Sequence, residues 1–93
     1  MKRMNDEWEI IGAVKVGEEG GRNFEIVLGY RETRFGKEWV TWECNDDHGK
    51  YNYYWGHYHR IEKSAYEEYS KRIMDGYKFF YDISIIKGWE DKA

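Results

Sequence analysis

The feature that most constrains the fold is a series of short segments in which apolar and polar residues alternate, with turn sequences between them. In residues 24–30 the apolar side chains fall on every second position: Phe24, Ile26, Leu28 and Tyr30. A β-strand presents such a set on one face. Residues 45–50 (Asn-Asp-Asp-His-Gly-Lys) form the clearest turn sequence, because Asn and Asp tolerate turn conformations and Gly49 accepts a positive φ. The pattern predicts strands at 7–16, 24–30, 39–44 and 51–58.

The periodicity changes after residue 60. Apolar side chains then recur at a spacing of four, which is typical of one face of an α-helix: Ile61, Ala65, Tyr69 and Ile73. Ser64 followed by Glu67 fits a capping box at a helix start, and Gly76 is a natural C-terminal stop. We therefore expect a helix over residues 64–75. Alternation returns in residues 78–87 and predicts a final strand.

The expected order of elements is β-β-β-β-α-β, an α+β fold in which an antiparallel meander carries one helix on one face. Ninety-three residues suffice for one modest core, so we expect a single domain over residues 1–93. Because only one helix is predicted, the other sheet face has no helical cover from this chain. We expect that face to be solvated or to contact a partner.

Composition narrows the function classes. The chain has 15 Lys and Arg against 18 Asp and Glu, which argues against a protein whose main affinity is for a phosphate backbone. Aromatic residues make up 19%, more than a small core hides, and disordered chains are poor in them. We find no apolar run long enough to span a membrane and no secretory signal pattern. The single cysteine fits a reducing compartment, so we expect a cytoplasmic protein.

The soft metal ligands of the chain are Cys44, His48, His57 and His59. Zinc accepts such a set, but no Cys-x-x-Cys or helical His-x-x-x-His spacing fixes its geometry. Half-buried polar positions explain the same residues better, so a small metal-dependent protein that uses Cys44 and the histidines is the third function considered. Catalytic motifs are also absent from the sequence, since the glycine-rich segments lack the Lys-Ser/Thr of a phosphate-binding loop. We therefore expect no cofactor and no enzymatic activity.

A single-stranded nucleic-acid-binding module is the alternative function. Tyr51, Tyr53 and Trp55 would form a base-stacking platform on a strand. Basic residues that are near in sequence would contact phosphates: Arg31, Arg34, Lys37 and Lys50. The acidic residues of the 45–50 turn weaken this reading, and the same aromatic residues are equally suited to a core.

Three segments carry a family resemblance: Tyr30-Arg31-Glu32-Thr33, the Val-x-Trp of residues 39–45, and Trp55-Gly56-His57-Tyr58. Together with Ala65, Tyr69 and Arg72, they make residues 24–74 resemble small uncharacterised proteins of phages and mobile elements of Gram-positive bacteria. The resemblance implies an accessory protein with no assigned activity. Small proteins of that origin are often inhibitors of host defence, including anti-CRISPR proteins.

These observations together predict a small binding protein that inhibits or modulates a host or element-encoded protein, most concretely a CRISPR or other defence nuclease. Tyrosine and tryptophan supply much of the contact energy of interfaces. We expect the partner-binding surface to consist of Trp39, Tyr53, Trp55 and His57, and the core to contain Trp42, Cys44, Tyr54 and Tyr58. An apolar edge strand at 79–86 also favours a symmetric homodimer.

Overall fold

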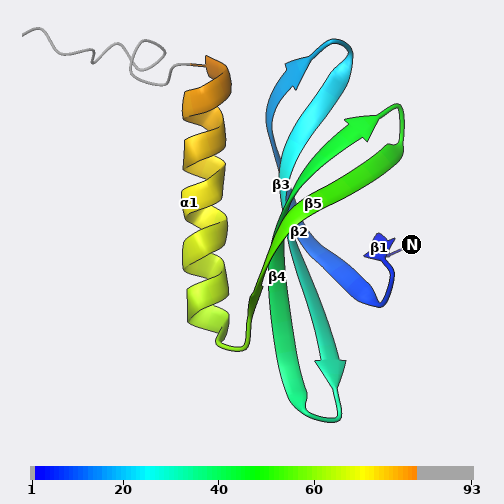
Figure 1. The fold of residues 1–93 in the computed structure, drawn as a ribbon, viewed down its shortest axis with the longest axis vertical. Helices are drawn as coiled ribbons and strands as arrows, with labels where there is room; N and C mark the ends of the chain where they lie inside the picture. Colours follow the sequence, from blue (N-terminus) through cyan, green and yellow to red (C-terminus); the bar gives the residue numbers. More distant parts are fainter. Residues whose placement is uncertain (1, 82–93) are drawn as a thin grey trace, which may run out of the picture.

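The computed structural model describes residues 2–81. Its strands follow one another along the chain and pair in the same order: β1 (Met4–Asn5), β2 (Trp8–Glu19), β3 (Arg22–Thr33), β4 (Gly36–Asp47) and β5 (Lys50–His59). Every pairing is antiparallel. The chain then enters one long helix, α1 (Glu62–Tyr81), which lies along one face of the sheet (Figure 1). The predicted α+β class and the meander with one covering helix are confirmed.

The predicted turn at 45–50 connects β4 to β5. His48 and Gly49 have φ values of 55° and 89°, as a two-residue hairpin turn with the twist of its flanking strands requires. The amide of Gly49 donates a hydrogen bond of 2.7 Å to Oδ1 of Asp46. This local chemistry places β5 beside β4 and creates the sheet edge that borders the groove described below.

The helix is longer than the sequence pattern predicts. It begins at Glu62 rather than at Ser64, whose hydroxyl contacts His59 instead of capping the helix. It also continues through Gly76, where an added Cβ would lie 2.8 Å from Cγ2 of Val16 in β2. Gly76 therefore permits close packing of α1 on the sheet and does not end the helix.

The predicted final strand is wrong at its start, because residues 78–81 belong to α1. Residues 82–87, the rest of that segment, lie outside the described residues. The edge strand expected at 79–86 for a homodimer loses its first three residues to the helix in the same way.

Between α1 and the sheet lies one part of the core. Leu28 of β3, Trp39 of β4 and Ala65 of α1 are buried there, with Tyr30 and Tyr69 packed against them. Leu28 and Tyr30 point to the same side, as the alternation in residues 24–30 predicts. The helix packs on this face because Ala65 and Gly76 keep its inner surface small.

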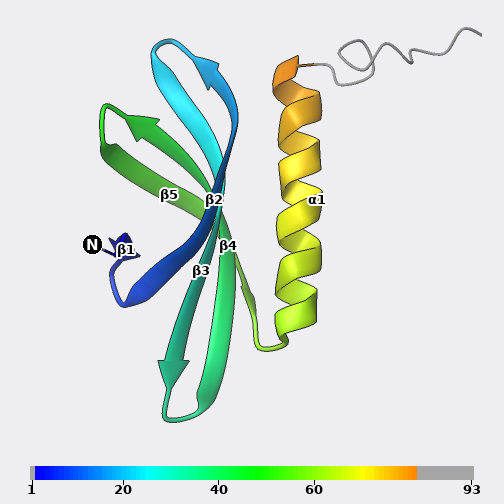
Figure 2. The same ribbon diagram turned by 180° about the vertical axis from the view of Figure 1, so that it is seen from behind.

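The sheet face turned away from α1 has a core of its own. It consists of Trp8, Val27, Val40, Trp42 and Cys44, with Ile10 and Tyr53 packed at its margin. The sheet curls away from the helix (Figure 2), and the rings of Trp8 and Trp42 meet edge to face at 5.9 Å. The indole of Trp42 fits against Gly29 and Gly56, where an added Cβ would approach it to 2.8 Å. Aromatic side chains of the sheet thus cover the face for which no helix was expected.

A β-bulge in β5 decides which side chains share a face. Thr41 pairs with His57 and Glu43 pairs with Tyr54, so β5 has one residue more than β4 in this interval. Trp55 lies inside the bulge with a φ of 56°. A shift of one residue moves every following side chain to the other face. The expected common face of Tyr53 and His57 is therefore wrong.

Candidate binding groove

An open groove of about 790 Å³ lies between the C-terminal half of α1 and the sheet. Its walls come from β2, β3, β4, β5 and α1. The aromatic residues that line it are Phe24, Tyr54, Trp55, Phe79 and Phe80. The groove exists because the β4–β5 hairpin diverges from the helix axis (Figure 1), whereas β2 and β3 stay in contact with the C-terminal half of α1.

Trp55 and Phe79 are the exposed aromatic side chains of the groove. Trp55 is 68% exposed and Phe79 is 79% exposed. The ring of Trp55 meets Tyr54 edge to face at 5.5 Å, which supports it from one side. Phe79 in turn meets Phe80 edge to face at 5.0 Å. Two large apolar rings, one from β5 and one from α1, are thus accessible to another molecule at one groove.

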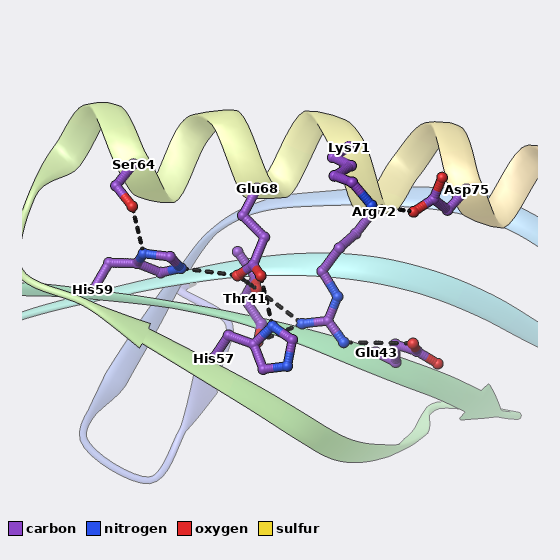
Figure 3. A network of polar contacts seen from close by, with 9 residues as sticks. All are labelled: Thr41, Glu43, His57, His59, Ser64, Glu68, Lys71, Arg72 and Asp75. Carbon is purple, nitrogen blue, oxygen red and sulfur yellow. Dashed lines mark hydrogen bonds and ion pairs between the residues drawn. The ribbon is translucent and has the colours of Figure 1, made fainter.

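A polar network joins α1 to β4 and β5 at the other end of the groove (Figure 3). Glu68 is its centre. Oε1 of Glu68 accepts a hydrogen bond of 2.9 Å from the hydroxyl of Thr41 and lies 2.8 Å from Nε2 of His59. Oε2 lies 2.6 Å from Nδ1 of His57. One carboxylate therefore holds two strands to the helix.

Arg72 continues this network one helical turn further. Its Nη1 donates to the carbonyl oxygen of Thr41 at 3.0 Å and to the hydroxyl at 2.9 Å. Its Nη2 lies 3.4 Å from Oε2 of Glu43. Thr41 is completely buried, and these bonds satisfy its polar atoms. Arg72 is thereby committed to the sheet and presents little free charge to the groove.

The contacts also determine the charge of Glu68. Burial alone would raise the pKa of this carboxyl group, but hydrogen bonds from His59, His57 and Thr41 outweigh it and lower the pKa to about 2. Glu68 therefore carries a full negative charge at neutral pH, and the helix is fixed to the sheet by a charged group.

Ser64, His59 and Glu68 stand in the order of a nucleophile, a base and an acid. The Ser64 hydroxyl lies 2.9 Å from Nδ1 of His59, and Nε2 of the same ring contacts Glu68. However, the groove is lined by His57 and Glu68 and not by Ser64, so a molecule in the groove does not meet this hydroxyl. The geometry favours a structural role, in which the first turns of α1 are held to β5.

The four residues expected to bind a partner have different positions. Trp55 and His57 line the groove, as an exposed surface requires. Trp39 is only 6% exposed and packs under α1, so its expected exposure is wrong. Tyr53 packs against Trp42 on the far face, with ring centroids 5.3 Å apart. The bulge explains this separation, because it reverses the faces of β5 after Tyr54.

The expected core set is also divided. Trp42 and Cys44 are buried as predicted. Tyr58 is 67% exposed, although its ring contacts Trp8 at 5.8 Å, so it is not a core residue. Tyr54 is half-buried in the groove wall. Both tyrosines belong to β5, which is an edge strand and receives cover from one neighbour only.

The structure does not bring the four soft ligands together. Cys44 belongs to the core of the far face, His57 and His59 face α1, and His48 lies in the β4–β5 turn. Burial and the charge of Glu25 raise the pKa of the Cys44 thiol to about 11, which makes it a poor nucleophile. Within residues 2–81, no group of three His, Cys, Asp or Glu side chains is arranged to hold a metal ion.

Sequence reasoning missed Glu68 and Phe79 as residues of this groove. A signal for Glu68 was present, because Ser64, Glu68 and Arg72 recur at a spacing of four beside the apolar stripe. For Phe79 the sequence pattern is misleading, since its alternation with Tyr81 predicts a strand.

No family model matches the chain, and neither the curated proteins nor the solved structures contain a match to it. Among the described residues, no helix has the length and apolar character needed to cross a membrane.

Proposed function

We propose that the protein acts by binding another protein through the groove between α1 and the sheet. The observation that carries the proposal is Trp55, a large apolar side chain that is 68% exposed and held at a φ of 56° by the bulge. A bulky residue in this conformation is strained by about 1–3 kcal/mol. Tryptophan is enriched among the residues that anchor interfaces, and strained backbone positions cluster at functional sites.

The charges of the groove favour a protein partner over a nucleic acid. Five carboxylates line it: Glu19, Glu25, Glu43, Glu68 and Asp75. Against them stand Lys71 and Arg72, which pair with Asp75 and Glu43. Arg3 pairs with Glu25, so the carboxylates still exceed the cations that contact them. A phosphate backbone would be repelled from such a surface. Single-stranded nucleic-acid binding, the alternative from the sequence, therefore has less support, and a metal-dependent function using Cys44 has none.

The proposed role of the binding rests on the resemblance that the sequence motifs of residues 24–74 suggest to proteins of phages and mobile elements. We propose that the protein inhibits or modulates a host or element-encoded protein in the host cytosol, most concretely a CRISPR or other defence nuclease. It would act stoichiometrically and without chemistry of its own, since Ser64 of the Ser-His-acid arrangement in the described residues does not line the groove.

Affinity capture from a Gram-positive host lysate tests the proposal, with two groove variants and one matched control. Trp55→Ala and Phe79→Ala remove exposed rings from the groove. Phe35→Ala removes a ring that is 72% exposed but lies in the β3–β4 turn. We expect each groove variant to weaken capture of the partner by about 30-fold, equivalent to about 2 kcal/mol, and the control to capture normally.

The same capture with nuclease treatment separates the two function classes. Capture of a partner that persists after nuclease treatment and depends on Trp55 supports protein binding. Capture that is lost after nuclease treatment supports the nucleic-acid alternative. Equal capture by all three variants would refute the groove as the binding surface.

A further inference from the structure

We propose, on the basis of the binding function above, that the groove accepts a basic segment of its partner, in which lysine or arginine side chains flank a large apolar one. The groove offers two features that such a segment matches: exposed aromatic rings and an excess of carboxylates over cationic side chains. Complementary charge selects partners and their register at interfaces.

An excess of negative charge remains in the groove after the ion pairs within residues 2–81 are counted, because these pairs involve three of its five carboxylates. Lys71 lies 3.0 Å from Oδ2 of Asp75, and Arg72 bonds Thr41 and Glu43. Glu19, at the end of β2, is exposed and forms no ion pair with any residue in the described range 2–81. Glu43 shares Arg72 only at 3.4 Å. Glu25 pairs with Arg3 at 2.9 Å. Glu19 and Glu68 therefore remain without a Lys or Arg partner among the described residues, and Glu19 is the more exposed of the two.

The aromatic rings favour the same kind of segment. Lysine and arginine carry apolar stems below their charge, and the stems pack on rings while the cation is attracted to the ring face. Trp55 and Tyr54 offer such faces beside Glu43. Phe79, Phe80 and Phe24 form an apolar wall that suits one leucine or aromatic side chain of the partner. An acidic segment can also supply apolar side chains, and a nucleic acid can supply planar bases. Both carry negative charge, however, which the excess of carboxylates in the groove disfavours.

Two synthetic peptides test the inference on the full chain. Both have twelve residues with leucine and tryptophan at the same positions, and the remaining positions are all lysine in one and all glutamate in the other. We expect the lysine peptide to shift the NMR signals of the Trp55 indole and of the Glu19 and Phe79 amides in a saturable way. We expect the glutamate peptide to leave them unchanged.

A matched pair of variants localises the charge effect. Glu19→Gln and Glu18→Gln change the net charge equally, but Glu18 pairs with Lys15 and does not line the groove. We expect Glu19→Gln to weaken the affinity for the lysine peptide about fivefold, which is the upper range for one solvent-exposed charge pair. Glu18→Gln should change this affinity less than about twofold. Equal weakening by both would mean general attraction to an acidic protein and would overturn the inference.

Other outcomes also overturn it. Binding of the glutamate peptide, or of neither peptide, contradicts a basic occupant. Contacts of the Trp55 indole with residues 82–93 or with a second copy, seen without peptide, would identify a different occupant. Failure of the proposed function is recognised separately: capture from the lysate would then be independent of Trp55 and Phe79. If capture needs these rings but the peptides are not distinguished by charge, only the present inference fails.

Discussion

Replacement of Glu68 by glutamine tests the network that fixes α1 to the sheet. Glutamine has nearly the same shape but lacks the charge that His57 and His59 contact at 2.6 and 2.8 Å. The pKa of Glu68 is lowered from an ordinary value of 4.5 to about 2, since hydrogen bonds to the carboxylate outweigh its burial. Without solvent screening, a pKa difference of this size corresponds to about 3 kcal/mol in the free energy of unfolding. Solvent along the groove side of the carboxylate reduces it to about 1–2 kcal/mol.

The sign of the pH dependence follows from the direction of the shift. A carboxyl group whose pKa is lowered on folding stabilises the fold above its unfolded pKa. We therefore expect the wild type to exceed Glu68→Gln by about 1–2 kcal/mol in free energy of unfolding between pH 5 and pH 7. The advantage should decline as the pH falls from about 4.5 to about 2, where Glu68 becomes protonated in the folded state as well.

Urea unfolding at a series of pH values, followed by circular dichroism, measures this difference. Glu67→Gln is the matched control, since Glu67 is the neighbouring exposed residue of α1 and pairs only with Lys63 among the described residues. Its effect should stay below about 0.5 kcal/mol at every pH. A wild-type advantage over Glu68→Gln that is unchanged from pH 7 to pH 2.5 would refute the reasoning, because the charge would then not be what Glu68 contributes.

Three further predictions concern single positions. Trp42→Ala should lower the free energy of unfolding by about 3–5 kcal/mol, because Trp42 is buried and only 5% exposed. Trp55→Gly should leave that free energy unchanged or raise it by up to about 1 kcal/mol, because glycine relieves the strain of the positive φ. Equal losses for the two variants in urea unfolding would contradict this assignment of faces. Gly76→Ala should lower the free energy of unfolding by about 1 kcal/mol, although alanine has the better helix propensity, because the new Cβ would lie 2.8 Å from Val16 of β2. A higher melting temperature of this variant would show that the helix is not packed there. The Cys44 thiol, buried and with its pKa raised to about 11, should react with an aromatic disulfide reagent at pH 8 only after denaturation, and rapid reaction of the native protein would contradict its burial.

The parts of the fold that were predictable depend on local patterns. The meander follows from alternation between turn sequences, and the 45–50 turn forms with the residue types that its φ values require. The helix α1 begins two residues before the predicted start at Ser64. The Ser64 hydroxyl contacts a histidine of β5 and does not cap the backbone of its own helix. Capping depends on a local contact, but here a tertiary contact competes for the same hydroxyl.

Two errors had causes that a single sequence does not contain. Gly76 looks like a helix stop, but its role is set by Val16, which is 60 residues earlier in the chain and leaves no unstrained room for a Cβ at position 76. The faces of β5 depend on the bulge at Trp55, and the alternation of Tyr51, Tyr53, Trp55 and His57 gives no sign of it. One extra residue sufficed to separate Tyr53 from the groove and to bring His57 to Glu68.

The bulge also gives the strongest reason to assign Trp55 to an intermolecular contact. The core needs the neighbouring glycine, since the indole of Trp42 occupies the space where a Gly56 side chain would be. It places no such demand on Trp55, whose ring points away from that core and is mostly exposed. Glycine or asparagine would adopt the positive φ with less strain, and any polar side chain would expose less apolar surface. Folding therefore gains little from tryptophan at this position, whereas a partner that packs on the groove gains a rigid, preorganised anchor.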